Sequence, residues 1–211
     1  MSADGRTLAS CDRLTDTLAK GMTGLVHLWE LPSGKSKGKL TGSPHPVDGS
    51  IAISADGRFL AAGGWNYQAS LWELGKGAEP RSLIGHKGSV RGVDFAPDAR
   101  RLASCASDGT VKLWTPETGQ EIATFKPGGD PWEQVRFAPD GRTLALGSNA
   151  GALRLIDAVT GAIRATLTGH AGAIRGLAFT RDGRTLLSGD AKGKVLLWDV
   201  SAFSGPPKAG G

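Results

Sequence analysis

The 211-residue sequence lacks any long apolar run. No stretch approaches the roughly 18 consecutive apolar residues of a membrane-spanning helix, so we predict no membrane segment. Residues 1–6 also lack the basic and apolar pattern of a secretory signal and the arginine and serine bias of a transit peptide. These absences predict a cytoplasmic protein.

Histidine and cysteine are scarce, which leaves little material for metal or redox chemistry. None of the four histidines falls at metal-ligand spacing with cysteine or a carboxylate. The two cysteines, Cys11 and Cys105, lie at equivalent positions in repeated units, described below, that are two places apart. That separation exceeds the roughly 7 Å between Cα atoms that a disulfide spans. We predict no metal site, no cofactor and no internal disulfide.

Motifs for catalysis are also missing. The sequence has no Gly-x-Ser-x-Gly elbow, and its many aspartates fall in turns. Gly34, Lys35 and Ser36 resemble the end of a phosphate-binding loop, but Trp29 stands where the first glycine belongs and no helical pattern follows. We therefore predict that the chain is not an enzyme.

The net charge is +5, yet the basic residues do not form a cluster. Many of them are one arginine that recurs after a turn, at Arg6, Arg58, Arg100, Arg142 and Arg184. A nucleic-acid interface needs basic residues on one face and aromatic residues among them, and neither pattern is seen. We predict that nucleic acid is not the partner.

What the sequence has is an internal repeat. It contains 32 glycines, about twice the average share, and they are spread along the chain as turns would be. Asp-Gly or a variant of it recurs with a period of 42 residues after the first unit, at Asp4, Asp56, Asp98, Asp140 and Asp182. A second marker follows sixteen residues later in four of these five units, at Trp72, Trp114, Ile156 and Trp198. Two markers in register indicate a repeat protein.

The third unit predicts four short antiparallel strands. Residues 90–95 alternate between apolar and polar side chains, and the turn residues of 96–99 lead into a second strand at 102–105. A tight turn at 107–109 precedes the third strand at 110–114. Residues 121–125 form a shorter fourth strand.

Several motifs recur together at this period, and they resemble the WD-repeat signature. The third unit carries Gly85-His86, Phe95-Ala96-Pro97-Asp98, and the run from Ser107 to Trp114, and the fifth unit carries Trp198-Asp199. The resemblance implies an all-β fold, a β-propeller of four-stranded antiparallel blades. It divides the chain into about five blades, with units at 1–41, 42–83, 84–125, 126–167 and 168–200, followed by a flexible tail at 201–211.

The first and last blades are predicted to be incomplete. Met1 aligns with the last apolar residue of each inner strand, so the first unit lacks its innermost strand, and the prolines after Val200 suit an outermost strand poorly. The chain is therefore expected to contain about eighteen strands in total. The first unit also has nine extra residues between Ser10 and Val26, which we interpret as a longer hairpin loop. Such a chain is expected to be the C-terminal part of a longer propeller; an open arc, a five-bladed ring or an oligomer are the alternatives.

Members of the WD-repeat family often tie a blade together with a tetrad of histidine, serine, aspartate and tryptophan. The resemblance assigns this structural tetrad to His86, Ser104, Asp108 and Trp114. By the same alignment only the third unit is complete, because Lys192 takes the place of aspartate in the fifth. The fourth unit has Leu146 and Ile156 instead, and we expect them to pack as a plain apolar core.

The resemblance also places ligand contacts on one rim, at the start of the inner strands and before the hairpin turns. The partner-binding residues assigned in this way are Trp65, Ser89, Arg91, Ser107, Trp132, Glu133 and Arg175. Tryptophan and arginine are enriched at interface hot spots, which favours Trp65, Arg91, Trp132 and Arg175. The alternative is that Trp132 caps its inner strand and that the arginines are simply solvated.

These features predict a non-catalytic scaffold that binds a protein or peptide partner on one rim. The sequence leaves two alternatives open. In the first, the propeller is a regulatory part attached to an upstream catalytic domain such as a bacterial kinase. In the second, it is a fragment that self-associates through unclosed blade edges.

Overall fold

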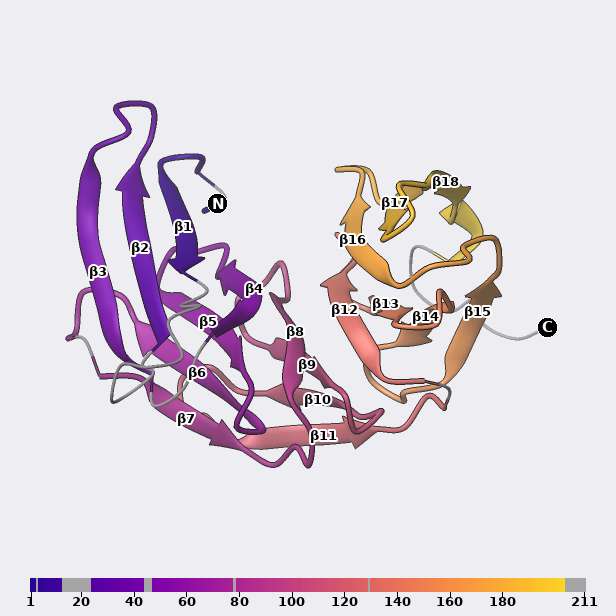
Figure 1. Cartoon of the computed structure of the whole chain (residues 1–211), viewed down its shortest axis with the longest axis horizontal. Coiled ribbons are helices and arrows are strands. Elements are labelled where there is room, and N and C mark those ends of the chain that lie inside the picture. Colours follow the sequence, from indigo (N-terminus) through magenta and orange to yellow (C-terminus); the bar gives the residue numbers. More distant parts are fainter. Residues whose placement is uncertain (3, 13–23, 44–46, 78, 129, 204–211) are drawn as a thin grey trace.

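The computed structural model describes residues 1–2, 4–12, 24–43, 47–77, 79–128 and 130–203 (Figure 1). Within these ranges the chain forms five antiparallel sheets that follow one another along an open arc. The predicted all-β fold of propeller blades is confirmed. The first and last sheets lie at the two ends of the arc (Figure 1).

The three middle sheets have four strands each, and every strand pairs with its neighbour in sequence. The second sheet comprises β4 (Val47–Ile53), β5 (Phe59–Gly64), β6 (Gln68–Glu73) and β7 (Arg81–Ile84). The third comprises β8 (Val90–Phe95), β9 (Leu102–Ala106), β10 (Val111–Trp114) and β11 (Glu121–Phe125). The fourth comprises β12 (Trp132–Phe137), β13 (Thr143–Ser148), β14 (Leu153–Asp157) and β15 (Ile163–Leu167).

The two end sheets have three strands each among the described residues, as predicted. The first contains β1 (Thr7–Asp12), β2 (Gly24–Glu30) and β3 (Ser36–Ser43), and the last contains β16 (Ile174–Phe179), β17 (Thr185–Asp190) and β18 (Val195–Asp199). The extra loop predicted in the first unit falls on 13–23, outside the described residues. In the predicted tail, Ser201–Phe203 form a short 3-10 helix, and 204–211 are not described.

The recurrent aspartate turns explain why the strands double back where they do. In the third sheet the Asp98 carboxylate accepts the backbone N–H of Arg100 at 2.9 Å. A short polar side chain that bonds its own backbone two residues on stabilises a turn without help from the rest of the fold. The same bond recurs at Asp4, Asp56, Asp140 and Asp182. We call the edge formed by these turns the aspartate rim.

The core lies between consecutive sheets. Ala103, Cys105, Val111 and Leu113 pack from the third sheet onto the fourth, and Leu102 and Trp114 pack from the opposite side onto the second. We call the side that contacts the next sheet in sequence the forward face, and the side that contacts the preceding sheet the backward face. Because strand side chains alternate, each middle sheet buries both faces. The molecule is thus a row of forward-on-backward contacts.

Candidate functional site

The predicted tetrad residues of the third sheet come together at its backward face. The Ser104 hydroxyl lies 2.7 Å from Nε2 of His86 and accepts the indole N–H of Trp114 at 2.8 Å. Ser104 sits on β9 directly beside β10, which carries Trp114, while His86 approaches from the loop before β8. All three side chains are buried, so each polar atom needs a protein partner.

Asp108 joins this set through a fifth residue, which the sequence reasoning missed. Nδ1 of His86 is 2.8 Å from the Thr110 hydroxyl and 3.6 Å from the Asp108 carboxylate. Thr110 donates its hydroxyl hydrogen to Asp108 at 2.6 Å. Its oxygen therefore accepts Nδ1–H of His86, and Nε2 accepts the Ser104 hydroxyl. The result is one directed chain of hydrogen bonds from Trp114 to Asp108.

In the fifth unit the structure corrects the residue assigned to the aspartate position of the tetrad. Lys192 was expected at the aspartate position, which would leave the set incomplete, but Asp190 occupies that role. Nδ1 of His170 lies 2.9 Å from the Asp190 carboxylate, and Nε2 lies 2.6 Å from the Ser188 hydroxyl. Ser188 accepts the indole N–H of Trp198 at 2.7 Å. Asp190 stands two positions earlier in the hairpin than Asp108 does, and at that position its carboxylate contacts the imidazole directly.

In the fourth unit an apolar core and a buried tryptophan replace the network. Leu146 and Ile156 are fully buried in the same core cluster, as expected. Trp132 is also fully buried, so its assignment to the partner-binding rim was wrong. The Arg154 guanidinium lies 5.6 Å above the Trp132 ring and donates to the carbonyls of Pro127 and Gly128. The indole caps the start of β12 and does not face a partner.

Burial lowers the pKa of His86 to about 4, although the nearby Asp108 carboxylate works in the opposite direction. We expect a nuclear magnetic resonance titration of the ring to show it neutral throughout pH 5 to 7. Since the unfolded ring titrates near 6.5, protonation favours the unfolded chain, and the fold loses about 3 kcal/mol of stability from this group as pH falls from 6.5 to 4. A midpoint near 6.5 in the folded chain would contradict the network.

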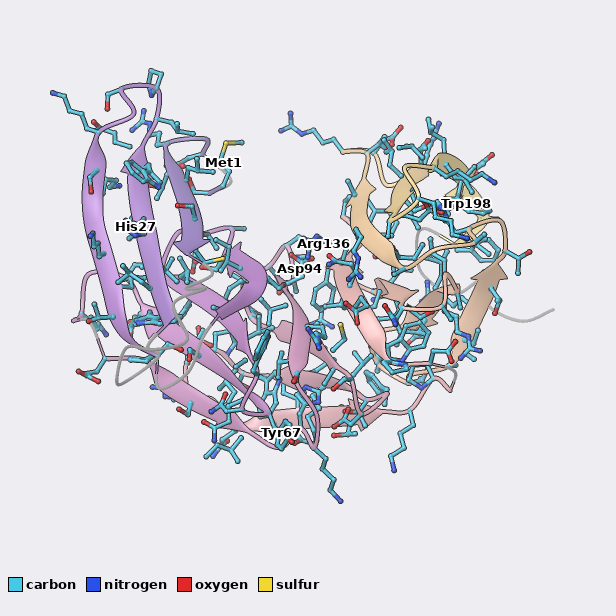
Figure 2. All side chains as sticks on the ribbon, in the orientation of Figure 1. Met1, His27, Tyr67, Asp94, Arg136 and Trp198 are labelled. Carbon is cyan, nitrogen blue, oxygen red and sulfur yellow. The ribbon has the colours of Figure 1, made fainter. Side chains whose placement is uncertain are left out.

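Asp94 works against this pH dependence. It lies on β8 at the inner side of the arc, next to Arg136 on β12 (Figure 2). Burial raises its pKa to about 6, and its carboxylate accepts the backbone N–H of Phe137 at 2.7 Å. A raised carboxyl pKa destabilises the fold as pH rises through 6, so Asp94 offsets part of the loss from His86 on acidification. For this reason the titration of the ring is a cleaner measurement than stability against pH.

Three of the predicted rim residues meet where the second and third sheets adjoin. The Ser89 hydroxyl donates to the backbone carbonyl of Trp65 at 3.3 Å, and the Ser107 N–H donates to the carbonyl of Ser89 at 3.0 Å. The Trp65 side chain leaves the β5–β6 hairpin and is 45% exposed. An indole in this position can contact a partner.

Two further predicted residues form a salt bridge between neighbouring inner strands. Arg175 on β16 lies 2.9 Å from the Glu133 carboxylate on β12, and the Arg175 side chain is 56% exposed. Arg91 occupies the corresponding place on β8 and is half-buried. The guanidinium of Arg175 is thus held in place and still open to solvent. We call the edge defined by Trp65, Ser89, Arg91, Ser107, Glu133 and Arg175 the hairpin rim.

Tyr67 also belongs to the hairpin rim, and the sequence reasoning did not identify it. Its backbone is left-handed, with φ of 69°, and its ring is 53% exposed. The equivalent positions in the next three hairpins are Gly109, Gly151 and Gly193, with φ of 76°, 88° and 82°. An alignment of the hairpin turns would have identified Tyr67, because it places an aromatic residue where the other three units have glycine.

The described residues were also searched for metal sites, reactive cysteines and membrane-spanning helices. Among them, no group of three or more histidine, cysteine or carboxylate residues could hold a metal ion. Cys105 is buried, and its burial raises the pKa of the thiol. Of the residues searched, none forms a helix long and apolar enough to cross a membrane.

Known proteins match the sequence of the repeat. The family "WD domain, G-beta repeat" matches residues 34–73, 77–115 and 161–199, more than half of the chain. A guanine nucleotide-binding protein subunit beta from Arabidopsis thaliana is 30% identical over 49% of this chain and 29% of its own length. The human serine-threonine kinase receptor-associated protein is 32% identical over 36% of the chain and 22% of its own. A periodic tryptophan protein 2 homolog from Neurospora crassa is 24% identical over 46% and 11%.

The matched segment thus spans less than a third of each of these relatives. The three family matches include the tryptophan-bearing strands of the second, third and fifth sheets, which are β6, β10 and β18. The first three strands of the fourth sheet, β12 to β14, lie between the second and third matches, and Ile156 replaces that tryptophan on β14. The repeat period, the four-stranded sheets and the buried histidine networks all agree with this match. The chain belongs to the WD-repeat family.

Proposed function

We propose that the chain is a non-catalytic interaction module that binds a protein or peptide partner along the hairpin rim. Trp65 and Tyr67 supply the apolar contacts, and Arg175, held by Glu133, supplies a cation. Interfaces concentrate their binding energy in a few aromatic and arginine side chains of this kind. Ser89 and Ser107 lie beside Trp65, Arg91 lies on β8 along the same rim, and the three would complete the contact with polar groups.

The conformation of Tyr67 is the observation that supports this proposal most directly. A left-handed backbone costs a residue with a side chain about 1 to 2 kcal/mol, and glycine escapes that cost. The other three aligned hairpins have glycine, so the turn itself does not require tyrosine. Strained residues gather at functional sites because the side chain is needed there. The Tyr67 ring is 53% exposed, so a large part of its surface is open to a partner.

The relatives point to the same class of function. Their names describe a subunit of a guanine nucleotide-binding protein and a protein associated with a kinase receptor, so each acts with other proteins. A rigid row of sheets with variable loops suits such a role, since the fold holds the loops in place and the loops supply the contacts. The side chains of the loops, and not the fold that carries them, determine which partner is bound.

A peptide selection tests the proposal. A phage-displayed random peptide library is panned on the wild-type chain, and the affinity of the enriched peptides is measured by interferometry. We expect Trp65→Ala to weaken binding by about 30-fold, the value for loss of a hot-spot side chain. Arg100→Ala, on the aspartate rim, is the matched control and is expected to change nothing.

Tyr67→Gly separates binding from folding. It restores the residue type of the other hairpins, so we expect unchanged stability or a gain of up to about 1 kcal/mol in thermal unfolding. The same variant is expected to weaken peptide binding. Peptides that bind all three variants as tightly as wild type, or a library that yields no binder, would refute the hairpin rim as the site.

A further inference from the structure

The forward face of the last sheet is an unused copy of an interface that the chain makes elsewhere. Val195 and Leu197 on β18 are 63% and 70% exposed. Their counterparts, Val111 and Leu113 in the third sheet and Leu153 and Leu155 in the fourth, are at most 2% exposed, because the next sheet covers them. Exposed aliphatic residues on a sheet face are typical of an interface.

The backward face of the first sheet shows the complementary exposure. Leu8 on β1 is 39% exposed, whereas its counterparts Leu60, Leu102, Leu144 and Leu186 are fully buried. Beside it, Trp29 donates its indole N–H to Ser10 at 2.9 Å, as the tryptophans of the third and fifth sheets do to their serines. Trp29 remains partly exposed, unlike Trp72 and Trp114. One face of each type is therefore left open.

These two faces lie at opposite ends of the arc and do not meet within one molecule (Figure 1). We propose that a second copy of the chain completes the contact, with its first sheet packed on the last sheet of its neighbour. Consecutive sheets in the chain already pack a forward face on a backward face. The proposed contact repeats that arrangement between molecules, and it is independent of the function proposed for the hairpin rim.

The contact joins two different surfaces, so it is heterologous. Each molecule that binds through its forward face still offers its backward face to another copy, and growth continues unless the arc happens to close. Symmetric pairing of two β18 edges would instead stop at a dimer and would need only the last sheet. The two arrangements predict different responses to substitution at the two ends.

Charged substitutions at exposed positions test the proposal without harming the fold. Leu197→Asp blocks the forward face, and Leu8→Asp blocks the backward face. Leu197 is 70% exposed in the single chain and Leu8 39%, so we expect Leu197→Asp to unfold like wild type and Leu8→Asp to lose a small part of its stability, and thermal unfolding at low concentration checks that both variants are folded. Light scattering and sedimentation velocity are run on the full chain over a roughly fiftyfold range of concentration.

We expect wild type to grow beyond a dimer as concentration rises, and each variant alone to remain a monomer. An equal mixture of the two variants retains one open face of each type, so it should form heterodimers and nothing larger. A monomeric wild type over the whole range overturns the proposal, as does self-association by Leu8→Asp alone. The second result would assign the contact to the β18 edge, and a mixture without heterodimers would also count against head-to-tail packing.

Discussion

Replacing Ser104 with alanine is expected to lower the free energy of unfolding by about 2 to 6 kcal/mol, since two buried polar groups lose their partner at once. The Ser104 hydroxyl serves both the indole N–H of Trp114 and Nε2 of His86. An unsatisfied buried donor or acceptor costs about 1 to 3 kcal/mol, and water does not reach this fully buried site. Urea denaturation followed by tryptophan fluorescence measures the loss.

Ser10→Ala is the matched control for this substitution. Ser10 accepts the indole N–H of Trp29 in the same geometry, but both residues are partly exposed, so water can replace the lost hydroxyl. We expect a loss below about 1 kcal/mol there. Equal losses at the two serines would mean that burial does not set the strength of the network. An unchanged stability for Ser104→Ala would refute the network as a stabilising element.

Trp132→Ala is expected to cost about 3 to 5 kcal/mol, the range for emptying the space of a large buried aromatic residue. Trp132 sits in the core between the third and fourth sheets and also supports the Arg154 guanidinium. The variant should melt well below wild type in differential scanning calorimetry. A small effect would place the indole at the surface after all and restore it to the hairpin rim.

Trp132→Phe separates the volume of the indole from its hydrogen bonding. Nε1 of Trp132 has no hydrogen-bond partner among the described residues, so the substitution to phenylalanine removes part of the packing and no hydrogen bond. Trp114→Phe removes the same number of atoms and in addition takes a donor from Ser104. We therefore expect Trp132→Phe to be the milder of the two changes by about 1 kcal/mol. The reverse order would contradict the assignment of the two indoles.

The architecture could be predicted from the sequence because each strand pattern is local and repeats. The strands of the third unit were expected at 90–95, 102–105, 110–114 and 121–125, and they lie within one residue of these bounds. Turn residues, alternation and register act over a few positions, and five similar units report the same pattern independently. The three-stranded end sheets seen among the described residues were expected from the alignment of Met1 in the first unit and from the prolines after Val200 in the last.

The side-chain networks were harder to predict, because contacts are made in space and not by alignment. Asp190 is two positions away from the aligned aspartate, and only the course of the hairpin shows that its carboxylate faces His170. Thr110 was overlooked because the expected set had four members. Trp132 was placed on the rim because it lies at the start of the inner strand, but the first residue of that strand points into the core, as the equally buried Val90 and Ile174 do in the neighbouring sheets.

The aspartate rim has a consequence for how this molecule can change over time. Each of its turns is closed by a bond between one carboxylate and a backbone N–H two residues away, so that closing bond is local to the turn. The turns of the third and fourth sheets are nevertheless linked, because the Arg101 guanidinium donates to the carbonyl of Gly141 at 2.7 Å. Exposed turn residues outside these bonds, such as Arg100, can be replaced at little cost to stability, whereas replacing Arg101 removes a bond between two sheets. At the hairpin rim the loops of neighbouring sheets are also bonded to each other, since the Ser89 hydroxyl donates to the backbone carbonyl of Trp65. A substitution in one of these loops therefore affects the position of the other. Both edges of the arc therefore carry bonds between neighbouring sheets, and we expect the residues that make these bonds to change together.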